Sequence, residues 1–451
     1  MVEDLLELLP RIMTTRLVGS VLRTDGLAIA VGAFPAPVGG LVEIERQTGP
    51  VLRGEVIGFR DDQTIVYPFG TVNGVRRGNK VRLINTARYL RVGDDLLGRV
   101  VNANCTALDR NPQPGLLSRT CLDRPAPAAV DRPRIHEPLG TGIRAIDAML
   151  TCGRGQRIGI FSGSGVGKSV TLGMMARYTS ADVNVIGLVG ERGREVNEFL
   201  EQDLGSKGLA RSVVVVATSD EPALTRVQAA FTATAIAEHF RDRGNHVLLM
   251  MDSLTRVAMA QREIGLAAGE PPTTRGYPPS VFAMLPKLVE RAGLTSQGSI
   301  SGFYNVLVEG DDTNEPISDT VRGLLDGHIV LSRNLAARGH YPAIDLLSSI
   351  SRLMPALASA EHQQAARTVR ELLAVHRDHE DLISIGAYRA GSNPLVDTAI
   401  QMKPEIDRFL CQEMNESTQF ESTIDAFSTL ARQCQQEKPV SKTSTVPSAP
   451  R

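Results

Sequence analysis

Phe161-Ser-Gly-Ser-Gly-Val-Gly-Lys-Ser169 is the stretch that decides the fold, because it stands where a buried strand should become a helix. The run Arg157-Ile-Gly-Ile-Phe161 before it is short and apolar, and the apolar residues of 170–177 after it recur at helical spacing. Strand, glycine-rich loop and helix in this order are typical of a phosphate-binding loop. We therefore predict that this segment binds the phosphates of a nucleotide.

The residue types of the loop suit that task. Glycines let the backbone amides turn inward around phosphate oxygens, and the helix that follows adds its positive end. Lys168 is expected to reach the β- and γ-phosphates, and the Ser169 hydroxyl is expected to ligate Mg²⁺. The first position of the pattern, usually Gly or Ala, holds the small Ser162. The predicted nucleotide-binding residues are Ser162, Gly163, Ser164, Gly165, Val166, Gly167, Lys168, Ser169 and Val170.

Composition limits the class of protein. The chain has 451 residues, 22% charged and 42% hydrophobic, with a formal net charge of -1. These values predict a soluble protein of two or three domains, and the near-neutral charge and few aromatic residues weigh against nucleic acid as a partner. Because we find no long apolar run and no secretory signal, a cytosolic location is expected. Five scattered cysteines predict reduced thiols rather than a zinc site.

Patterning along the chain predicts its domains. Short apolar runs between glycine-containing turns indicate a small antiparallel barrel or sandwich, and later apolar runs alternate with helical patterns, as in an α/β fold with a mostly parallel sheet. The final part is helical until a Ser-, Thr-, Lys- and Pro-rich tail. The predicted division is an amphipathic arm (1–14), a β-barrel (15–90), a connecting segment with a proline-rich linker (91–138), an α/β core that carries the phosphate-binding loop (139–355), a helical domain (356–436) and a disordered tail (437–451). The arm either caps the barrel or docks a partner.

Two acidic residues end predicted strands at the edge where the loop lies. Asp252 follows the apolar run 246–251, and it is expected to hold Mg²⁺ rather than only to cap the next helix. Glu191 follows the run 183–189. If the bound nucleotide is hydrolysed, a carboxylate at this place can orient the water molecule that attacks the phosphate. From spacing alone, Glu191 is equally well interpreted as a residue of an exposed turn, and the neighbouring Arg192 is just as ambiguous.

Longer motifs carry a resemblance to a family. Gly190-Glu-Arg-Gly-Arg-Glu-Val196 and the segments 254–265, 269–282 and 323–333 resemble the ATPases of type III protein export, which are relatives of the catalytic subunits of rotary F-type and V-type ATPases. The segment 381–394 resembles the flagellar branch of that family. The resemblance implies a RecA-like core that binds ATP with Mg²⁺.

The resemblance also implies roles for single residues. Glu191 matches the catalytic glutamate, Arg192 a phosphate-site arginine and Asp252 the second acidic motif. Arg352 matches an arginine that enters the site of a neighbouring subunit, where it would stabilise charge on the γ-phosphate. Tyr341 matches an aromatic residue that packs against adenine, although a half-buried structural tyrosine is the alternative.

As a family member, the protein is expected to hydrolyse ATP as a homohexamer at the inner membrane beneath the flagellum. The implied partners are a stator-like regulator at the N-terminal arm, a coiled-coil stalk in the ring channel near the loop 270–279, the membrane export gate, and export substrates with their chaperones. Four alternatives stay open: a virulence-type secretion ATPase, a rotary ATP synthase subunit, a nucleotide-holding subunit without turnover and an RNA translocase. Glu191 argues against the third, because non-catalytic subunits of the relatives lack it.

Overall fold

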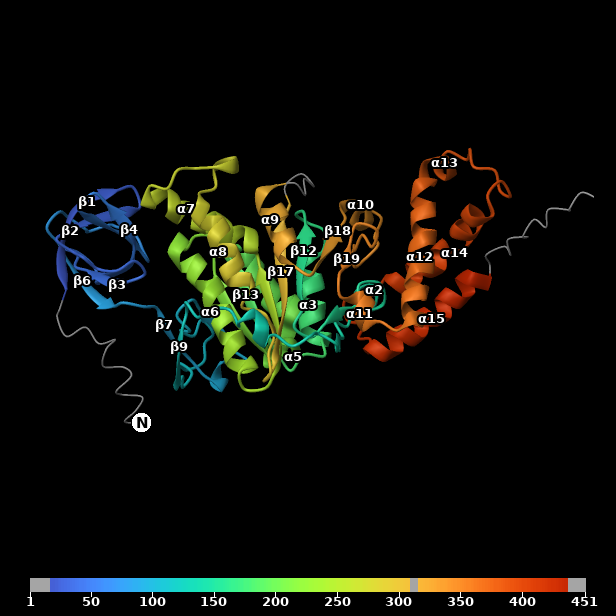
Figure 1. Ribbon diagram of the computed structural model, residues 1–451, viewed down its shortest axis with the longest axis horizontal. Helices are drawn as coiled ribbons and strands as arrows, with labels where there is room; N and C mark the ends of the chain where they lie inside the picture. Colours follow the sequence, from blue (N-terminus) through green and yellow to red (C-terminus); the bar gives the residue numbers. More distant parts are fainter. Residues whose placement is uncertain (1–16, 309–314, 437–451) are drawn as a thin grey trace, which may run out of the picture.

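The computed structural model describes residues 17–308 and 315–436, which form three bodies in a row (Figure 1). A β-barrel lies at one end, an α/β domain in the middle and a group of helices at the other end. The predicted arm (1–14) and tail (437–451) lie outside the described residues. Within the described ranges, no helix is long and apolar enough to cross a membrane.

The N-terminal body is a closed barrel, as the short apolar runs between turns predicted. Its six strands close in the order β1-β2-β5-β4-β3-β6. Inward-facing residues such as Ile29, Val42 and Val66 are fully buried and form a core of their own. β2 is short and begins only two residues beyond the end of β1. The strands are β1 (Val18–Asp25), β2 (Ala28–Gly32), β3 (Leu41–Ile44), β4 (Leu52–Arg60), β5 (Gln63–Pro68) and β6 (Lys80–Asn85).

The middle domain is built on a nine-stranded, mostly parallel sheet, which confirms the predicted fold class. Its main path is β19-β18-β12-β17-β15-β13-β14-β8, and β16 pairs with β17. The uninterrupted apolar run 213–217 in β14 suits a sheet that is covered on both faces. The strands are β8 (Val100–Asn102), β12 (Arg157–Ser162), β13 (Val183–Val189), β14 (Ser212–Ala217), β15 (His246–Asp252), β16 (Gly293–Leu294), β17 (Ser299–Leu307), β18 (Gly327–Leu331) and β19 (Ile350–Ser351).

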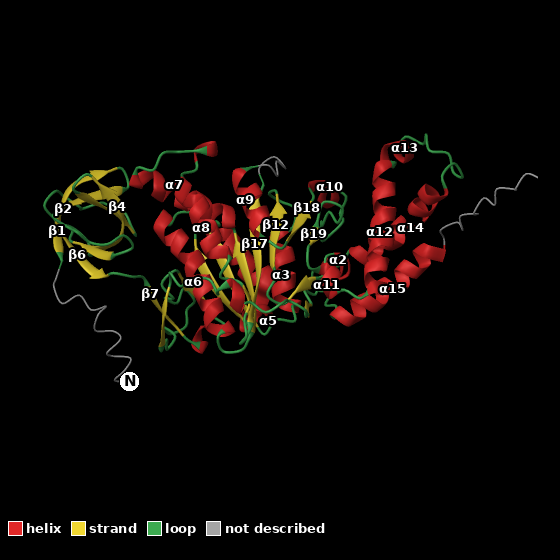
Figure 2. Cartoon of the chain, in the orientation of Figure 1, coloured by secondary structure: helices red, strands yellow, loops and turns green. Residues whose placement is uncertain are grey.

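Helices cover both faces of this sheet (Figure 2). Alternate residues of β13 point to opposite faces: Val185 joins the core beneath α6 to α9, and Ile186 joins the core beneath α2 and α3. The helices are α2 (Arg144–Met149), α3 (Lys168–Tyr178), α4 (Gly193–Glu198), α5 (Gly205–Ala210), α6 (Ala223–Arg241), α7 (Leu254–Ala268), α8 (Pro279–Val289), α9 (Pro316–Leu324) and α10 (Arg333–Ala337).

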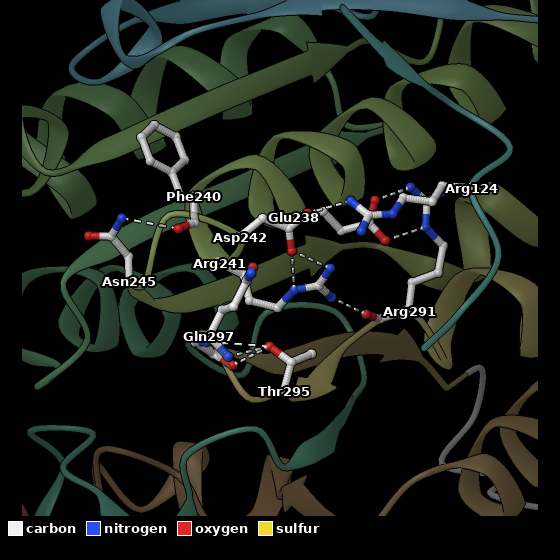
Figure 3. A network of polar contacts seen from close by, with 10 residues as sticks. Arg124, Glu238, Phe240, Arg241, Asp242, Asn245, Arg291, Thr295 and Gln297 are labelled. Carbon is white, nitrogen blue, oxygen red and sulfur yellow. Dashed lines mark hydrogen bonds and ion pairs between the residues drawn. The ribbon is translucent and has the colours of Figure 1, made fainter. Parts of the chain in front are cut away.

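The connecting segment is more ordered than its proline content predicts. β8 joins the edge of the central sheet beside β14, and β7 (Tyr89–Val92) pairs with β9 (Ser118–Cys121). A buried ion pair anchors the segment: Arg291 donates to both carboxylate oxygens of Glu238, at 2.9 and 2.6 Å, and to the carbonyl of Leu122 at 2.6 Å (Figure 3). Arg124 extends this network to Asp242.

The last domain is helical, as predicted. It packs against α2 and shares the hydrophobic core on the α3 face of the sheet. Its helices are α11 (Met354–Leu357), α12 (Ala360–Asp378), α13 (Glu380–Ser384), α14 (Pro394–Leu410) and α15 (Phe420–Gln436). The C-terminal helices therefore pack on the side of the sheet that also carries the phosphate loop's helix.

Candidate nucleotide site

A cavity of about 510 Å³ opens at the carboxyl ends of β12, β13 and β15. Parallel α/β sheets bind ligands at this edge. Most of the predicted residues line the cavity: Gly163, Ser164, Gly165, Gly167, Lys168, Ser169, Val170, Glu191, Arg192 and Asp252. Two others support it from below, because Ser162 ends β12 and Val166 is buried under the loop.

Two glycines of the loop are required by the local structure. Gly167 has a φ of 85° and directly precedes α3, so the chain enters the helix through a left-handed conformation that favours glycine. Gly165 has a φ of 78°, which lies in the same left-handed region. A side chain at either position would distort the loop that the cavity depends on.

Lys168 lies between two carboxylates. Its Nζ donates to Oδ1 of Asp252 at 2.8 Å and to Oε1 of Glu191 at 3.3 Å. The three side chains are 15%, 5% and 12% exposed, respectively, so little water screens their charges. The ammonium group is therefore held at the floor of the cavity, where an incoming phosphate could replace one of these carboxylates as its partner.

Burial and charge shift the ionisation of this cluster. Burial, followed by the nearby Asp252 carboxylate, raises the pKa of Glu191 to about 7. For Lys168, burial favours the neutral form, but the charges of Asp252 and Glu191 outweigh it, and the pKa is raised. A glutamate with a pKa near 7 can accept a proton at neutral pH, which is the property required of a general base.

Asp252 is the last residue of β15, as predicted, and it presents its carboxylate to the cavity floor. Its Oδ1 accepts from Lys168 and from Nδ2 of Asn305, the latter at 2.7 Å. Ser169 lines the same cavity at the start of α3. A hydroxyl and a carboxylate are the hard oxygen ligands that Mg²⁺ prefers, so these residues fit the metal that accompanies ATP.

Three polar residues in or beside the cavity were not predicted as site residues. Asn305 lies within β17, between β12 and β15, and contacts both Asp252 and the hydroxyl of Ser162. Arg256 lines the cavity, and its buried Nε has no hydrogen-bond partner among the described residues. Glu195 also lines the cavity and shares a hydrogen bond with Glu191. Glu195 and Arg256 both lie in segments that carry the family resemblance, 190–196 and 254–265, and that was the available signal.

The remaining predicted residues lie farther from Lys168. Arg192 is 81% exposed at the cavity rim, 3.6 Å from Glu195. The Tyr341 ring lies beside the loop: a Cβ atom added to Gly167 would lie 3.4 Å from Cε1 of that ring. Arg352 is exposed and follows β19, which pairs with the amino end of β18. Arg352 is therefore at the sheet edge opposite to its own phosphate loop.

Comparisons with known proteins match all three bodies of the chain. Residues 142–351 match the nucleotide-binding domain of the ATP synthase alpha/beta family, and residues 19–84 match the β-barrel domain of that family. Residues 358–429 match the T3SS EscN ATPase C-terminal domain. The flagellum-specific ATP synthase of Bacillus subtilis (strain 168) is 51% identical over 415 residues, which cover 92% of this chain and 94% of that protein.

The chain belongs to the flagellar and type III secretion ATPases.

Both branches of this ATPase family are near relatives. The type 3 secretion system ATPase of Xanthomonas euvesicatoria is 48% identical and covers 90% of this chain and 92% of its own length. Among solved structures, the assembled ATPase EscN of enteropathogenic E. coli has a TM-score of 0.86 at 45% identity and covers 92% of this chain and 100% of its own. EscN in complex with its central stalk EscO gives a TM-score of 0.85 at 44% identity, with coverage of 92% and 100%. The predicted family is confirmed.

Proposed function

We propose that this ATPase hydrolyses ATP with Mg²⁺ in a homohexameric ring that energises flagellar type III protein export. The observation that carries the proposal is Lys168, held at the floor of the nucleotide-sized cavity by Glu191 and Asp252. A phosphate-binding lysine, a metal-holding carboxylate and a carboxylate of raised pKa are the parts that phosphoryl transfer to water requires.

Each residue then has a defined task. Loop amides and Lys168 bind the phosphates, Tyr341 packs against the base, and Glu191 orients the attacking water and accepts its proton. Ser169 and Asp252 hold Mg²⁺, which neutralises charge on the phosphate oxygens when bound. Arg192 and Arg352 supply further positive charge, Arg352 from the neighbouring subunit.

Replacement of the lysine tests the enzymatic proposal. Lys168→Ala should lower kcat at least about 100-fold, because the charge that stabilises the transition state is lost. It should also abolish the rise in melting temperature that ATP and Mg²⁺ give the natural protein. Lys207→Ala, an exposed lysine of α5 in the same domain, is the matched control and should keep full activity. Turnover like that of the natural protein in the Lys168→Ala variant would contradict the mechanism.

The flagellar branch is favoured by the segment 381–394, because whole-chain identities overlap: 46–51% for flagellum-specific ATP synthases and 47–48% for type 3 secretion ATPases. Complementation tests this choice. Expressed in a bacterium that lacks its own flagellum-specific ATP synthase, the chain should restore swimming. In a strain that lacks its virulence secretion ATPase, secretion should stay absent. The reverse result would assign the chain to the virulence branch.

The proposed ring and its stalk are supported by the solved relatives, because EscN was solved as an assembled ATPase and with the central stalk EscO. For this chain we propose a corresponding coiled-coil stalk in the ring channel, a stator-like regulator at residues 1–14, and the export gate, substrates and chaperones as further partners. The ring works in the cytoplasm against the inner membrane. Light scattering with and without ATP measures assembly, and a particle of six chains is expected.

A further inference from the structure

A buried glutamine outside the cavity connects the C-terminal helices to the nucleotide site. Gln412 lies in the α14–α15 connector, residues 411–419, and is 5% exposed. Its backbone N–H donates to the carbonyl of Tyr341 at 2.9 Å. The connector therefore holds the backbone of the residue whose ring lies against the phosphate loop.

The side chain of Gln412 fixes the connector in turn. Its Nε2 donates to the carbonyls of Gly142 and Glu416, each at 2.8 Å, and its Oε1 accepts from the backbone N–H of Arg144 at 2.9 Å. One amide thus joins the connector to the start of α2 and to itself. A buried amide with all these contacts is geometrically specified, because each unmade contact would leave a polar group unpaired.

Two arginines strengthen the same attachment. Arg144 donates to the carbonyls of Phe409 and Cys411 and pairs with Glu416. Arg177 belongs to α3, the helix that begins at Lys168, and its Nη2 donates to the carbonyl of Met414 at 2.6 Å. The connector is consequently bound to Tyr341 directly and to the C-terminal end of α3, the helix that begins at the phosphate loop.

We propose that Gln412 is a positioning residue for nucleotide binding, which fixes Tyr341 beside the phosphate loop and thereby sets affinity for the base. The proposal rests on the proposed function of Tyr341 as the residue that packs against adenine. Gln412 lines neither the cavity nor the cluster around Lys168. Loss of the Gln412 side chain should weaken the binding of substrate and transition state equally. KM for ATP should then rise while kcat stays unchanged.

Steady-state kinetics provide the first test. Gln412→Leu removes the three side-chain contacts while keeping a similar volume, and it should raise KM for ATP about tenfold with kcat within about twofold of the natural value. Gln412→Asn is one methylene shorter and should shift KM in the same direction by a smaller factor, so the test survives if the leucine variant does not fold. Gln363→Leu is the matched control, because Gln363 also bridges two carbonyls, those of Pro355 and Ala358. It should leave KM unchanged.

A ligand without a base separates positioning from general damage. Tripolyphosphate should inhibit the natural protein and Gln412→Leu with the same inhibition constant, because the phosphate loop is untouched. In a Tyr341→Ala background, Gln412→Leu should add less than about a twofold change in KM, since its effect acts through that ring. A weaker tripolyphosphate constant, or fully additive effects of the two substitutions, would overturn the proposal.

Fluorescence gives a readout independent of turnover. The chain contains no tryptophan, so Tyr341→Trp introduces a single indole at the base site. ADP should quench this indole, and addition of Gln412→Leu should move the quenching to about tenfold higher ADP. Quenching at an unchanged ADP concentration would contradict the role of Gln412. Absence of quenching in both variants would contradict the role of Tyr341. Loss of turnover in Lys168→Ala is a separate test of the ATPase activity itself.

Discussion

Glu191 is the residue whose ionisation should set the pH dependence of hydrolysis. Burial and the Asp252 carboxylate raise its pKa to about 7, and only the ionised form can accept a proton from water. Activity should therefore be lost as the pH falls through 7 and should level off above it. We expect kcat/KM, measured between about pH 5.5 and 8.5, to show an acid limb with an apparent pKa near that value.

The isosteric variant provides the control. Glu191→Gln should lower kcat about 100-fold or more and remove the acid limb, because the amide cannot accept the proton. Lys168, whose pKa is raised, stays charged throughout this range and should not contribute to the limb. An acid limb that persists in Glu191→Gln would assign the titration to another group.

At the scale of elements, the ion pair between Glu238 of α6 and Arg291 after α8 attaches the connecting segment to the α/β domain. Both side chains are 1% exposed. Glu238→Ala leaves a buried guanidinium without its partner, and it should destabilise α6 by about 3–5 kcal/mol. Hydrogen exchange of the α6 amides measures this opening free energy directly.

An exposed pair supplies the comparison. Arg226 donates to Glu263 at 2.8 Å, but Glu263 is 44% exposed, so Glu263→Ala should cost less than about 1 kcal/mol by the same measurement. Equal losses of opening free energy in Glu238→Ala and Glu263→Ala would mean that burial does not determine how much the Glu238–Arg291 pair stabilises α6.

Local signals explain which elements and residues could be predicted. The phosphate loop and Asp252 were predictable because strand, glycines and lysine are contiguous and a strand end fixes its edge of the sheet. Asn305 was not, because its contact with Asp252 depends on β17 lying between β12 and β15, and spatial strand order is not readable from chain order. β8 has three residues, too few for any periodicity, and Gln412 looks like an ordinary polar residue between helices.

The whole molecule places Arg352 where its own subunit cannot use it. β19 pairs with the amino end of β18, whereas the phosphate loop leaves the carboxyl end of β12, so the two lie roughly 15 Å apart along the parallel strands. Arg352 is exposed on the molecular surface, and an exposed cation there can serve a neighbouring copy. In a ring, Lys168 and Arg352 of one complete site would then come from different chains.

Mixed rings test this arrangement. Lys168→Ala and Arg352→Ala should each be nearly inactive alone. In a mixed ring, a site is complete only where an Arg352→Ala chain, which keeps Lys168, lies beside a Lys168→Ala chain that supplies an intact Arg352. Equal co-expression should therefore restore about a quarter of the natural activity. Mixing Lys168→Ala with Glu191→Gln should restore nothing, because both substitutions damage the site of their own chain. If the first mixture stays as inactive as its components, Arg352 does not act across the subunit boundary.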